Sequence, residues 1–290
     1  MKKVQIPKKS GGTRTIYVQG PTEKHKYRLL GQELSEFYEK NEAAPNLAHG
    51  FVQGRSPVSN ALCHTNKKYT LTIDLKNFFD TVTPKHLQIA GVDNEKSEKV
   101  CIDGATRQGL SSSPAAANCA AIPLDKLILK TILAEKMDVV YTRYADDMCF
   151  SSDKIEDLLL LKGKVPELVK IAGFEVNLKK TRIQSSNFGR RIITGIAVDD
   201  KIYATKNQRK ILRAAKHNVF KLKRLLFYLV QSKNHLWFAI LLEINRKNIS
   251  KYLGMKEWCL LKSPTKSLGG KCYTTMVNAK TKDAFKDFDV

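Results

Sequence analysis

The chain has 290 residues, 42% of them hydrophobic, which is enough to bury a large core and too much for a mainly disordered protein. It carries 50 Lys and Arg against 28 Asp and Glu, a net charge of +22, so a polyanion is expected as partner and nucleic acid is the first choice. No long apolar run indicates a membrane span, and the six cysteines lack disulfide or zinc spacing. We therefore expect a cytoplasmic protein without a membrane partner.

Up to about residue 204 the pattern alternates between short strands and helices. A strand over 71–75 runs into a turn at 77–80, and Ser111 to Pro114 is typical of a helix start. Pro123 kinks or restarts that helix. Further on, the pattern predicts strands over 139–144, 148–151 and 174–178 and a helix over 155–172. Because strands and helices are mixed without strict alternation, the fold class is predicted as α+β.

The remaining part of the chain, residues 205–290, is predicted as a second, mainly helical domain. Residues 201–290 hold 20 Lys and Arg and only 5 Asp and Glu. On a helix predicted over 206–230, basic residues recur at near-helical spacing: Lys206, Arg209, Lys210, Arg213 and Lys216. A solvated surface would mix both signs, so this face is expected to follow a nucleic-acid backbone. The pattern of residues 256–290 predicts no role.

Three acidic residues stand out because of where the predicted strands place them. Asp146 and Asp147 lie at the tip of a predicted hairpin, and Asp74 lies at the end of its strand. Adjacent carboxylates repel each other unless a cation lies between them, and two Mg²⁺ ions held in this way serve phosphoryl transfer. A solvated acidic turn is the alternative for the hairpin alone. The metal site requires the Asp74 strand to neighbour the hairpin, and we predict that pairing.

Across residues 6–200 the chain resembles a reverse transcriptase. Five segments follow the order of motifs in that family: IPKKSGGTRTI at 6–16, LTIDLKNFFD at 71–80, GATRQGLSSSP at 104–114, YADD at 144–147 and GFEVNLKKT at 173–181. The resemblance implies a right-hand polymerase architecture. Fingers and palm, with an antiparallel sheet, would occupy residues 1–204, and a helical, RNA-binding thumb would occupy 205–290.

The resemblance also implies site residues. The catalytic set would be Asp74, Asp146, Asp147 and Lys180, with Lys179 as the alternative to Lys180. Two Mg²⁺ ions would be held by the three aspartates and the Leu75 backbone carbonyl. The incoming dNTP would be bound by Lys8, Arg14, Phe79 and Gln108. Phe79 would exclude a ribose 2′-OH, so deoxynucleotides are expected. Of Phe78 and Phe79, one is expected in the core.

Two further segments resemble signatures of bacterial retron reverse transcriptases. These are Asn60-Ala61-Leu62-Cys63-His64 and Ile193-Thr194-Gly195. The resemblance implies that Asn60, His64, Thr194 and Gly195 bind RNA or shape the surface that does. The partners would be a cognate structured noncoding RNA, its RNA–DNA product, dNTPs and an effector protein acting in phage defence. Alternatives are a group II intron-like or diversity-generating reverse transcriptase, a noncatalytic RNA-binding defence scaffold, and an RNA polymerase.

Overall fold

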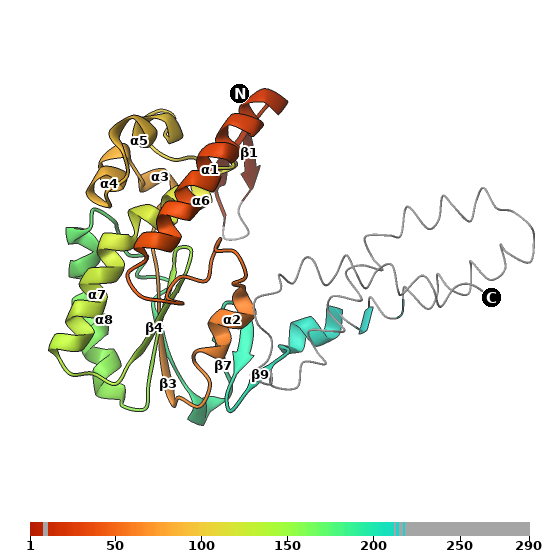
Figure 1. Ribbon diagram of the computed structural model, residues 1–290. Helices are drawn as coiled ribbons and strands as arrows, with labels where there is room; N and C mark the ends of the chain where they lie inside the picture. The colour runs from red at the N-terminus through yellow and green to blue at the C-terminus, as the bar shows by residue number, and fades with distance from the viewer. Residues whose placement is uncertain (8–10, 212, 215–216, 218–290) are drawn as a thin grey trace, which may run out of the picture. The chain divides into compact units, whose positions relative to one another are not determined.

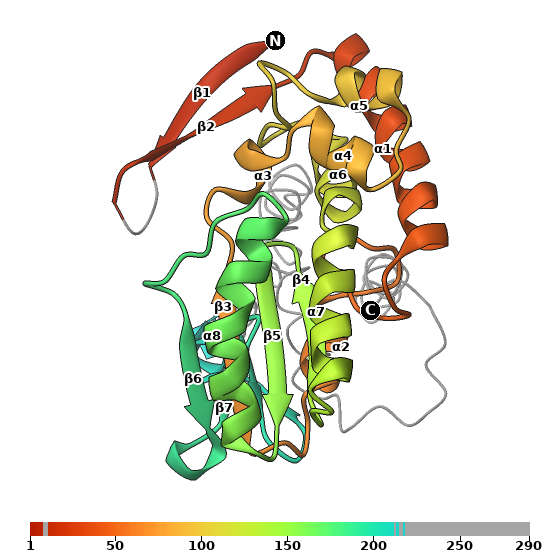
Figure 2. The same cartoon turned by 90° about the vertical axis from the view of Figure 1, so that its left-hand side faces the viewer.

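A computed structural model of the protein describes residues 1–7, 11–211, 213–214 and 217. The chain divides into two compact units, the first made of residues 1–194 and 198–200, the second of residues 195–197 and 201–290. Figures 1 and 2 show the elements of the chain from two directions. None of the helices in the described part of the chain is long and apolar enough to cross a lipid bilayer.

The first unit begins with a hairpin and a long helix. β1 (Lys2–Pro7) pairs antiparallel with β2 (Thr13–Val18). α1 (Pro21–Asn41) has proline at its first position, and the Glu23 carboxylate accepts a hydrogen bond from the Gly20 N–H at 3.1 Å. α1 packs against α6 (Ser113–Ala120), which is buried along its whole length.

The hairpin is held against the segment that leads into α6. The Tyr17 N–H donates a hydrogen bond to the Gln108 carbonyl at 2.8 Å. Gly109 has φ +101°, and a Cβ on it would lie 2.4 Å from the Tyr17 carbonyl oxygen. Glycine is therefore required at this position by both conformation and space. The contact fixes β2 beside Gln108.

A four-stranded antiparallel sheet forms the centre of the first unit, with the strand order β4-β5-β3-β6. Its strands are β3 (Tyr69–Asp74), β4 (Val140–Tyr144), β5 (Asp147–Ser152) and β6 (Arg182–Ser185). β3 is central, although it comes first in the chain, and it pairs with β5 on one side and β6 on the other. β4 and β5 form a hairpin. The mixture of helices with an antiparallel sheet confirms the predicted α+β class.

Two helices cover one face of this sheet. α7 (Ile122–Ala134) begins just after α6, where Pro123 restarts the helix as predicted, and α8 (Ile155–Ile171) packs on β3 and β5. Figures 1 and 2 show α7 and α8 side by side on that face. Four short helices complete the unit: α2 (Pro57–Leu62), α3 (Phe78–Thr81), α4 (Pro84–Ile89) and α5 (Asn94–Val100). α2 packs on β4 and on β7 (Arg191–Ile193), on the other side of the sheet in Figure 1.

Between β6 and residue 204 the elements are short. A 3-10 turn, Ser186–Phe188, precedes β7, and β8 (Ile196–Val198) and β9 (Ile202–Tyr203) follow it. The predicted strand over 174–178 is wrong: only Val176 forms an isolated bridge, to Leu75. The segment is held by single bonds instead, since the Lys76 N–H donates to the Glu175 carbonyl and the Asn177 N–H donates to the Asp74 carbonyl.

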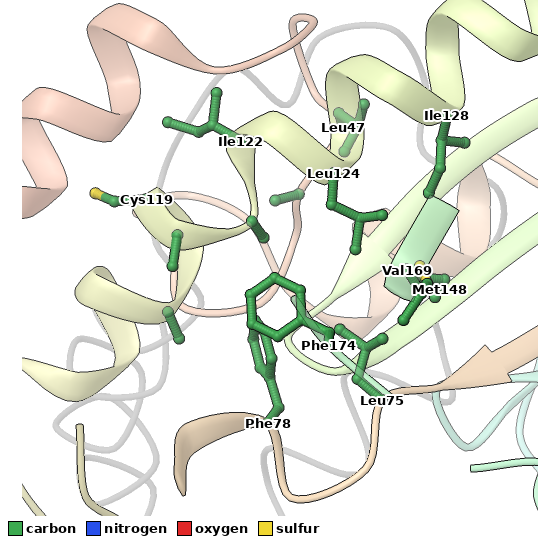
Figure 3. Packing of buried hydrophobic residues seen from close by; sticks show 14 of the residues in the cluster. Leu47, Leu75, Phe78, Cys119, Ile122, Leu124, Ile128, Met148, Val169 and Phe174 are labelled. Atoms are coloured by element: carbon green, nitrogen blue, oxygen red, sulfur yellow. The ribbon is translucent and has the colours of Figure 1, made fainter. Parts of the chain in front are cut away.

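The core lies between the sheet and the helices that cover it. Phe78 is 2% exposed and packs edge-to-face on Phe174, with ring centroids 5.4 Å apart. Figure 3 shows both rings beside Leu75, with Met148 close by. Deeper in the sheet, Phe150 is fully buried and stacks on Tyr141 at 4.7 Å. The core thus reaches to the ends of β3 and β5, where the acidic residues lie.

Replacing Phe150 with alanine tests this packing. Phe150→Ala should lower the free energy of unfolding by about 3–5 kcal/mol, because it removes a fully buried ring and leaves a cavity. The control is Leu159→Ala on α8, where the side chain is 53% exposed and the change should stay within about 0.5 kcal/mol. Urea unfolding followed by circular dichroism measures both. Equal stability of the two variants would contradict the packing described.

Candidate active site

The turn between β4 and β5 presents two adjacent carboxylates. β4 ends at Tyr144 and β5 begins at Asp147, and these two residues pair across the hairpin. Ala145 has φ 57°, a left-handed conformation that costs about 1 kcal/mol for a residue other than glycine. We call Tyr144 to Asp147 the acidic turn. Its strained backbone must be stabilised by the surrounding structure.

The register of β3 brings the third acid to the acidic turn. Asp74, the last residue of β3, lies directly opposite Asp147 on β5. The next N–H along the chain, that of Leu75, donates to the Asp146 carbonyl at 3.0 Å. The Asp74 strand therefore neighbours the hairpin, which confirms the pairing predicted from the sequence. All three aspartates lie at one end of the same two strands.

Their mutual repulsion is visible in their acidities. Partial removal from water, followed by repulsion from Asp146 and Asp74, raises the pKa of Asp147 to about 6. The pKa of Asp146 is also raised, by desolvation first and by the Asp74 charge second. Carboxyl groups that resist ionisation in this way have fewer positive neighbours than their charge requires. The cluster is suited to bind a cation.

One side chain already supplies part of that positive charge. The Lys180 Nζ lies 2.9 Å from Asp74 Oδ2, and this hydrogen bond raises the pKa of Lys180. The Asn177 amide donates to Asp74 Oδ1 at 3.2 Å. The structure thus brings Lys180 to the acids, as the family motif implied. Asn177 was not singled out from the sequence, although its position in the same motif, three residues before Lys180, could have indicated it.

The donor set suits magnesium, although its side chains are not arranged as ligands here. Mg²⁺ prefers carboxylate oxygens, phosphate and water, and uses few protein ligands. In the described part of the chain, no three His, Cys, Asp or Glu side chains are already gathered as a metal site. At this position the Asp74 carboxylate is engaged by Lys180 and Asn177. A bound metal would take the place of Lys180 on Asp74.

Asp74 and Asp146 line a cavity of about 910 Å³. Predicted nucleotide-binding and metal-binding residues line it, namely Arg14, Phe79, Gln108, Leu75, Asp74, Asp146 and Lys180. Arg14 and Gln108 also line a neighbouring cavity of about 340 Å³, together with Arg107 and Asp80. Lys8 lies outside the described residues. The structure therefore gathers the predicted nucleotide site around the acidic turn, apart from Lys8.

The two neighbouring phenylalanines have different environments. Phe78 is the core residue of the pair, as Figure 3 shows. Phe79 lines the cavity and meets the ring of Phe51 edge-to-face, with centroids 6.0 Å apart. The steric-gate role of Phe79 stays a prediction.

The residues predicted to bind RNA fall into two groups. Asn60 and His64 are fully buried: His64 Nε2 lies 2.7 Å from Thr142 Oγ1, which donates to Asn60 Oδ1 at 2.6 Å. Desolvation lowers the pKa of His64 to about 3, so its ring is neutral. Neither side chain is exposed for direct contact with RNA, and their role in shaping an RNA-binding surface stays a prediction. In the first unit, the Thr194 hydroxyl donates to the Pro57 carbonyl at 3.1 Å.

The second group belongs to the second unit. Residues 206–211 are helical, and Thr205 and Gln208 form a capping box at the helix start. Lys206, Arg209, Lys210 and Arg213 are exposed, as an RNA-binding face requires. Gly195 has φ +78°, and its carbonyl accepts a hydrogen bond from Gln208 Nε2 at 3.1 Å. Lys216 and the rest of the predicted thumb from residue 218 lie outside the described residues. Their RNA contacts stay predictions.

The raised pKa of Asp147 predicts how the free energy of unfolding depends on pH in the metal-free protein. The fold favours the protonated acid, so this stabilisation is complete below about pH 4 and is lost as the pH rises through about 6. Asp147→Asn should remove that loss. Converted in full, the pKa shift of Asp147 would correspond to about 3 kcal/mol in the free energy of unfolding. Because Asp147 is exposed, solvent screening reduces the expected gain of Asp147→Asn over the wild type to roughly 1 kcal/mol at neutral pH. Urea unfolding between pH 4 and 8 in EDTA measures this, and identical slopes for both proteins would contradict it.

Comparison with known proteins identifies the family. Residues 6–256 match the family profile described as reverse transcriptase (RNA-dependent DNA polymerase). The retron Ec73 reverse transcriptase of Escherichia coli is 33% identical over 229 residues, which cover 70% of each chain. The retron Mx65 and Mx162 reverse transcriptases of Myxococcus xanthus are 30% and 31% identical, and the match spans about half of their lengths, 54% and 46%.

The fold comparison agrees. Telomerase from Candida albicans superposes with a TM-score of 0.52 at 12% identity, over 99% of this chain and 64% of that one. Together with the family match, this likeness confirms the predicted right-hand polymerase architecture. The ordered motifs, the sheet that carries the three aspartates and the matched relatives lead to one conclusion. The chain belongs to the reverse transcriptase family and, within it, to the retron reverse transcriptases of bacteria.

Proposed function

We propose that the chain is an RNA-directed DNA polymerase that extends a primer on an RNA template by nucleotidyl transfer with two Mg²⁺ ions. The observation that carries the proposal is the register that places Asp74 opposite Asp147, with the Asp146 carbonyl accepting a hydrogen bond from Leu75, the residue that follows β3. Two of the three acids, Asp74 and Asp146, line a cavity of about 910 Å³, and a carboxylate cluster at such a cavity is what a nucleotide, a primer end and metal ions need. Family membership supports the same reaction.

Each lining residue has a part in this proposal. Asp74, Asp146, Asp147 and the Leu75 carbonyl would hold the ions, which lower the pKa of the primer hydroxyl and neutralise the departing pyrophosphate. Arg14, with Lys8, binds the triphosphate through charge-assisted hydrogen bonds. Gln108 lies along the new base pair, and Phe79 contacts the sugar and excludes a ribose.

Lys180 has a second part as proton donor. It is 2.9 Å from Asp74, with a raised pKa, so it carries a proton at neutral pH. With metal bound to Asp74, the Lys180 ammonium group would be free to donate its proton to the leaving pyrophosphate. Lys179 is the alternative donor.

The finer proposal concerns the RNA and its product. We infer that the enzyme binds a cognate structured noncoding RNA and copies part of it into single-stranded DNA that stays joined to the RNA. It would act in the cytoplasm with an effector protein in phage defence. The support is the pair of retron-like segments, Asn60 to His64 and Ile193 to Gly195, and the relatives named as retron enzymes.

Other functions predict different products. A group II intron-like or diversity-generating enzyme would extend primers but form no branched RNA–DNA molecule in cells. A noncatalytic RNA-binding scaffold would extend no primer at all. Recovery of RNA joined to DNA from cells that express the gene with its flanking region separates these possibilities.

The carboxylates of the acidic turn test the reaction itself. Asp146→Asn and Asp147→Asn should each lower the rate of primer extension by roughly 1,000-fold or more, because each removes a metal-binding charge worth several kcal/mol. RNA affinity should be unchanged or slightly higher, since negative charge near phosphate is lost. The matched control is Asp153→Asn, an acid near the other end of β5 that pairs with Lys67 at 3.3 Å. Extension at the wild-type rate by either turn variant would disprove the metal assignment.

A further inference from the structure

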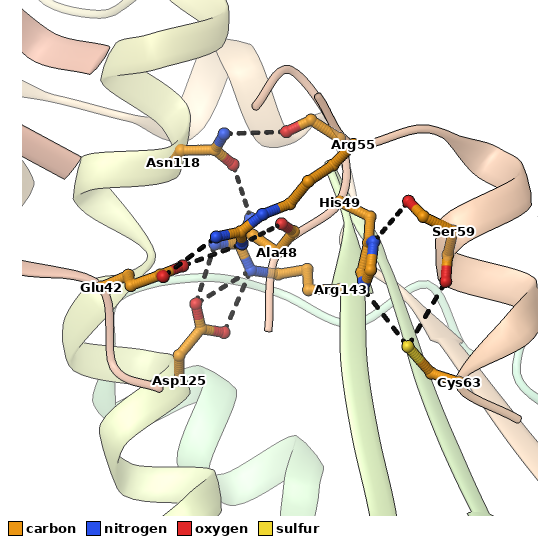
Figure 4. A network of polar contacts seen from close by, with 10 residues as sticks. Glu42, Ala48, His49, Arg55, Ser59, Cys63, Asn118, Asp125 and Arg143 are labelled. Carbon is orange, nitrogen blue, oxygen red and sulfur yellow. Dashed lines mark hydrogen bonds and ion pairs between the residues drawn. The ribbon is translucent and has the colours of Figure 1, made fainter. Parts of the chain in front are cut away.

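A buried ion pair lies directly behind the acidic turn. Arg143, next to last in β4, is fully buried, and its Nη2 lies 2.8 Å from Oδ2 of the equally buried Asp125 on α7. Arg143 Nε donates to both oxygens of the same carboxylate, at 3.0 and 3.1 Å. A buried pair of this kind is rigid, because breaking it would leave an uncompensated charge. Figure 4 shows Arg143 between Asp125 and Asn118.

The third guanidinium nitrogen of Arg143, Nη1, bonds the acidic turn and Asn118. Arg143 Nη1 donates to the Ala145 carbonyl at 3.1 Å and to Asn118 Oδ1 at 3.0 Å. Ala145 is the turn residue with the strained left-handed backbone. The fixed cation therefore stabilises the conformation from which Asp146 and Asp147 extend.

Asn118 links this cation to a second support of the turn. Its Nδ2 donates to the Gly50 carbonyl at 2.8 Å. Gly50 lies against the turn so closely that a Cβ on it would be 2.5 Å from the Ala145 nitrogen. The segment before Gly50 runs beside β4, since the His49 N–H donates to the Arg143 carbonyl at 2.7 Å and the Arg143 N–H donates to the Leu47 carbonyl at 2.9 Å.

These contacts converge on one amide. Asn118 is 2% exposed on α6, and both ends of its side chain are used, one for Arg143 and one for Gly50. Gly50 and Arg143 both contact the backbone of Ala145, so a shift of either one would also move Ala145. No other bond in the cluster joins α6 to both supports of the turn within the described residues.

We propose that Asn118 is a positioning residue, which fixes the acidic turn so that Asp146 and Asp147 face Asp74 in the geometry needed for metal binding. The inference rests on the proposed function for its catalytic consequence, but its structural part stands apart from activity. It predicts that the turn is locally rigid without any ligand and that this rigidity depends on the Asn118 amide.

The test compares Asn118→Ala with Ser151→Ala. Ser151 is also fully buried, and its hydroxyl bonds Thr70 across the same sheet at 2.8 Å, without contact to the turn. Both variants should lose global stability, and Asn118→Ala should lose more, because it removes two buried hydrogen bonds whereas Ser151→Ala removes the bond to Thr70. In the metal-free protein, amide hydrogen exchange measured by mass spectrometry should be about tenfold faster at Ala145 to Asp147 in Asn118→Ala only.

Kinetics give the second readout. Asn118→Ala should lower kcat by about 10–100-fold, as is usual when the support of a metal ligand is lost, while the KM for dNTP changes less than about twofold. Ser151→Ala should keep both values. Mn²⁺ titration followed by electron paramagnetic resonance should show weaker binding in Asn118→Ala alone.

Several outcomes would overturn the proposal. It fails if exchange at the turn and kcat are the same in Asn118→Ala and Ser151→Ala, since Asn118 would then contribute only to stability. If Asn118→Ala does not fold, Gly50→Ala replaces it, because the added methyl group would lie 2.5 Å from the Ala145 nitrogen and must displace the turn or the Gly50 segment that Asn118 holds. Unchanged exchange at the turn in that variant also refutes the inference. A wild-type protein that extends no primer would refute the proposed function, and the exchange experiment would still decide the role of Asn118.

Discussion

The pairing of β3 with β5 is the constraint on which the site depends. Side chains alternate along a strand, so a shift of one residue would turn Asp74 to the other face of the sheet. The core prevents such a shift, because Leu71 and Ile73 on β3 and Phe150 on β5 are buried on the same two strands. Hydrophobic packing thus fixes the register, and the register brings carboxylates together although they repel each other.

The residues around the three aspartates offset part of the repulsion between their carboxylates. Lys180 and Asn177 engage Asp74, while Arg143 holds the backbone of the acidic turn from the buried side. The Lys180 side chain is largely exposed, so a bound cation could take its place on Asp74. Arg143 is fully buried in its ion pair with Asp125 and has no such freedom. A rigid turn beside a replaceable ammonium group gives a site that is preformed in its backbone and adjustable in its charge.

Local sequence patterns account for part of this site. The acidic hairpin, the α+β class and the helix restart at Pro123 follow from periodicity and from the residues at turns. The ordered motifs added Arg14, Phe79 and Gln108, which line the same cavity. The support behind the turn could not be predicted in the same way. Gly50, Asn118 and Asp125 are distant in sequence from the acidic turn, and their roles depend on tertiary contacts. Asn60 likewise gave no sign of being buried, since side chains of this type are mostly exposed.

The most direct test of the account maps where a metal binds. Fe²⁺ in place of Mg²⁺, with ascorbate and peroxide, produces radicals that cut the backbone next to the bound ion. The account predicts cuts near Asp74 and near Asp146 in the same molecule, suppressed by excess Mg²⁺ and absent in the Asp146→Asn protein. Cuts at only one of the two segments, or at sites away from both, would show that the three carboxylates do not share a metal site.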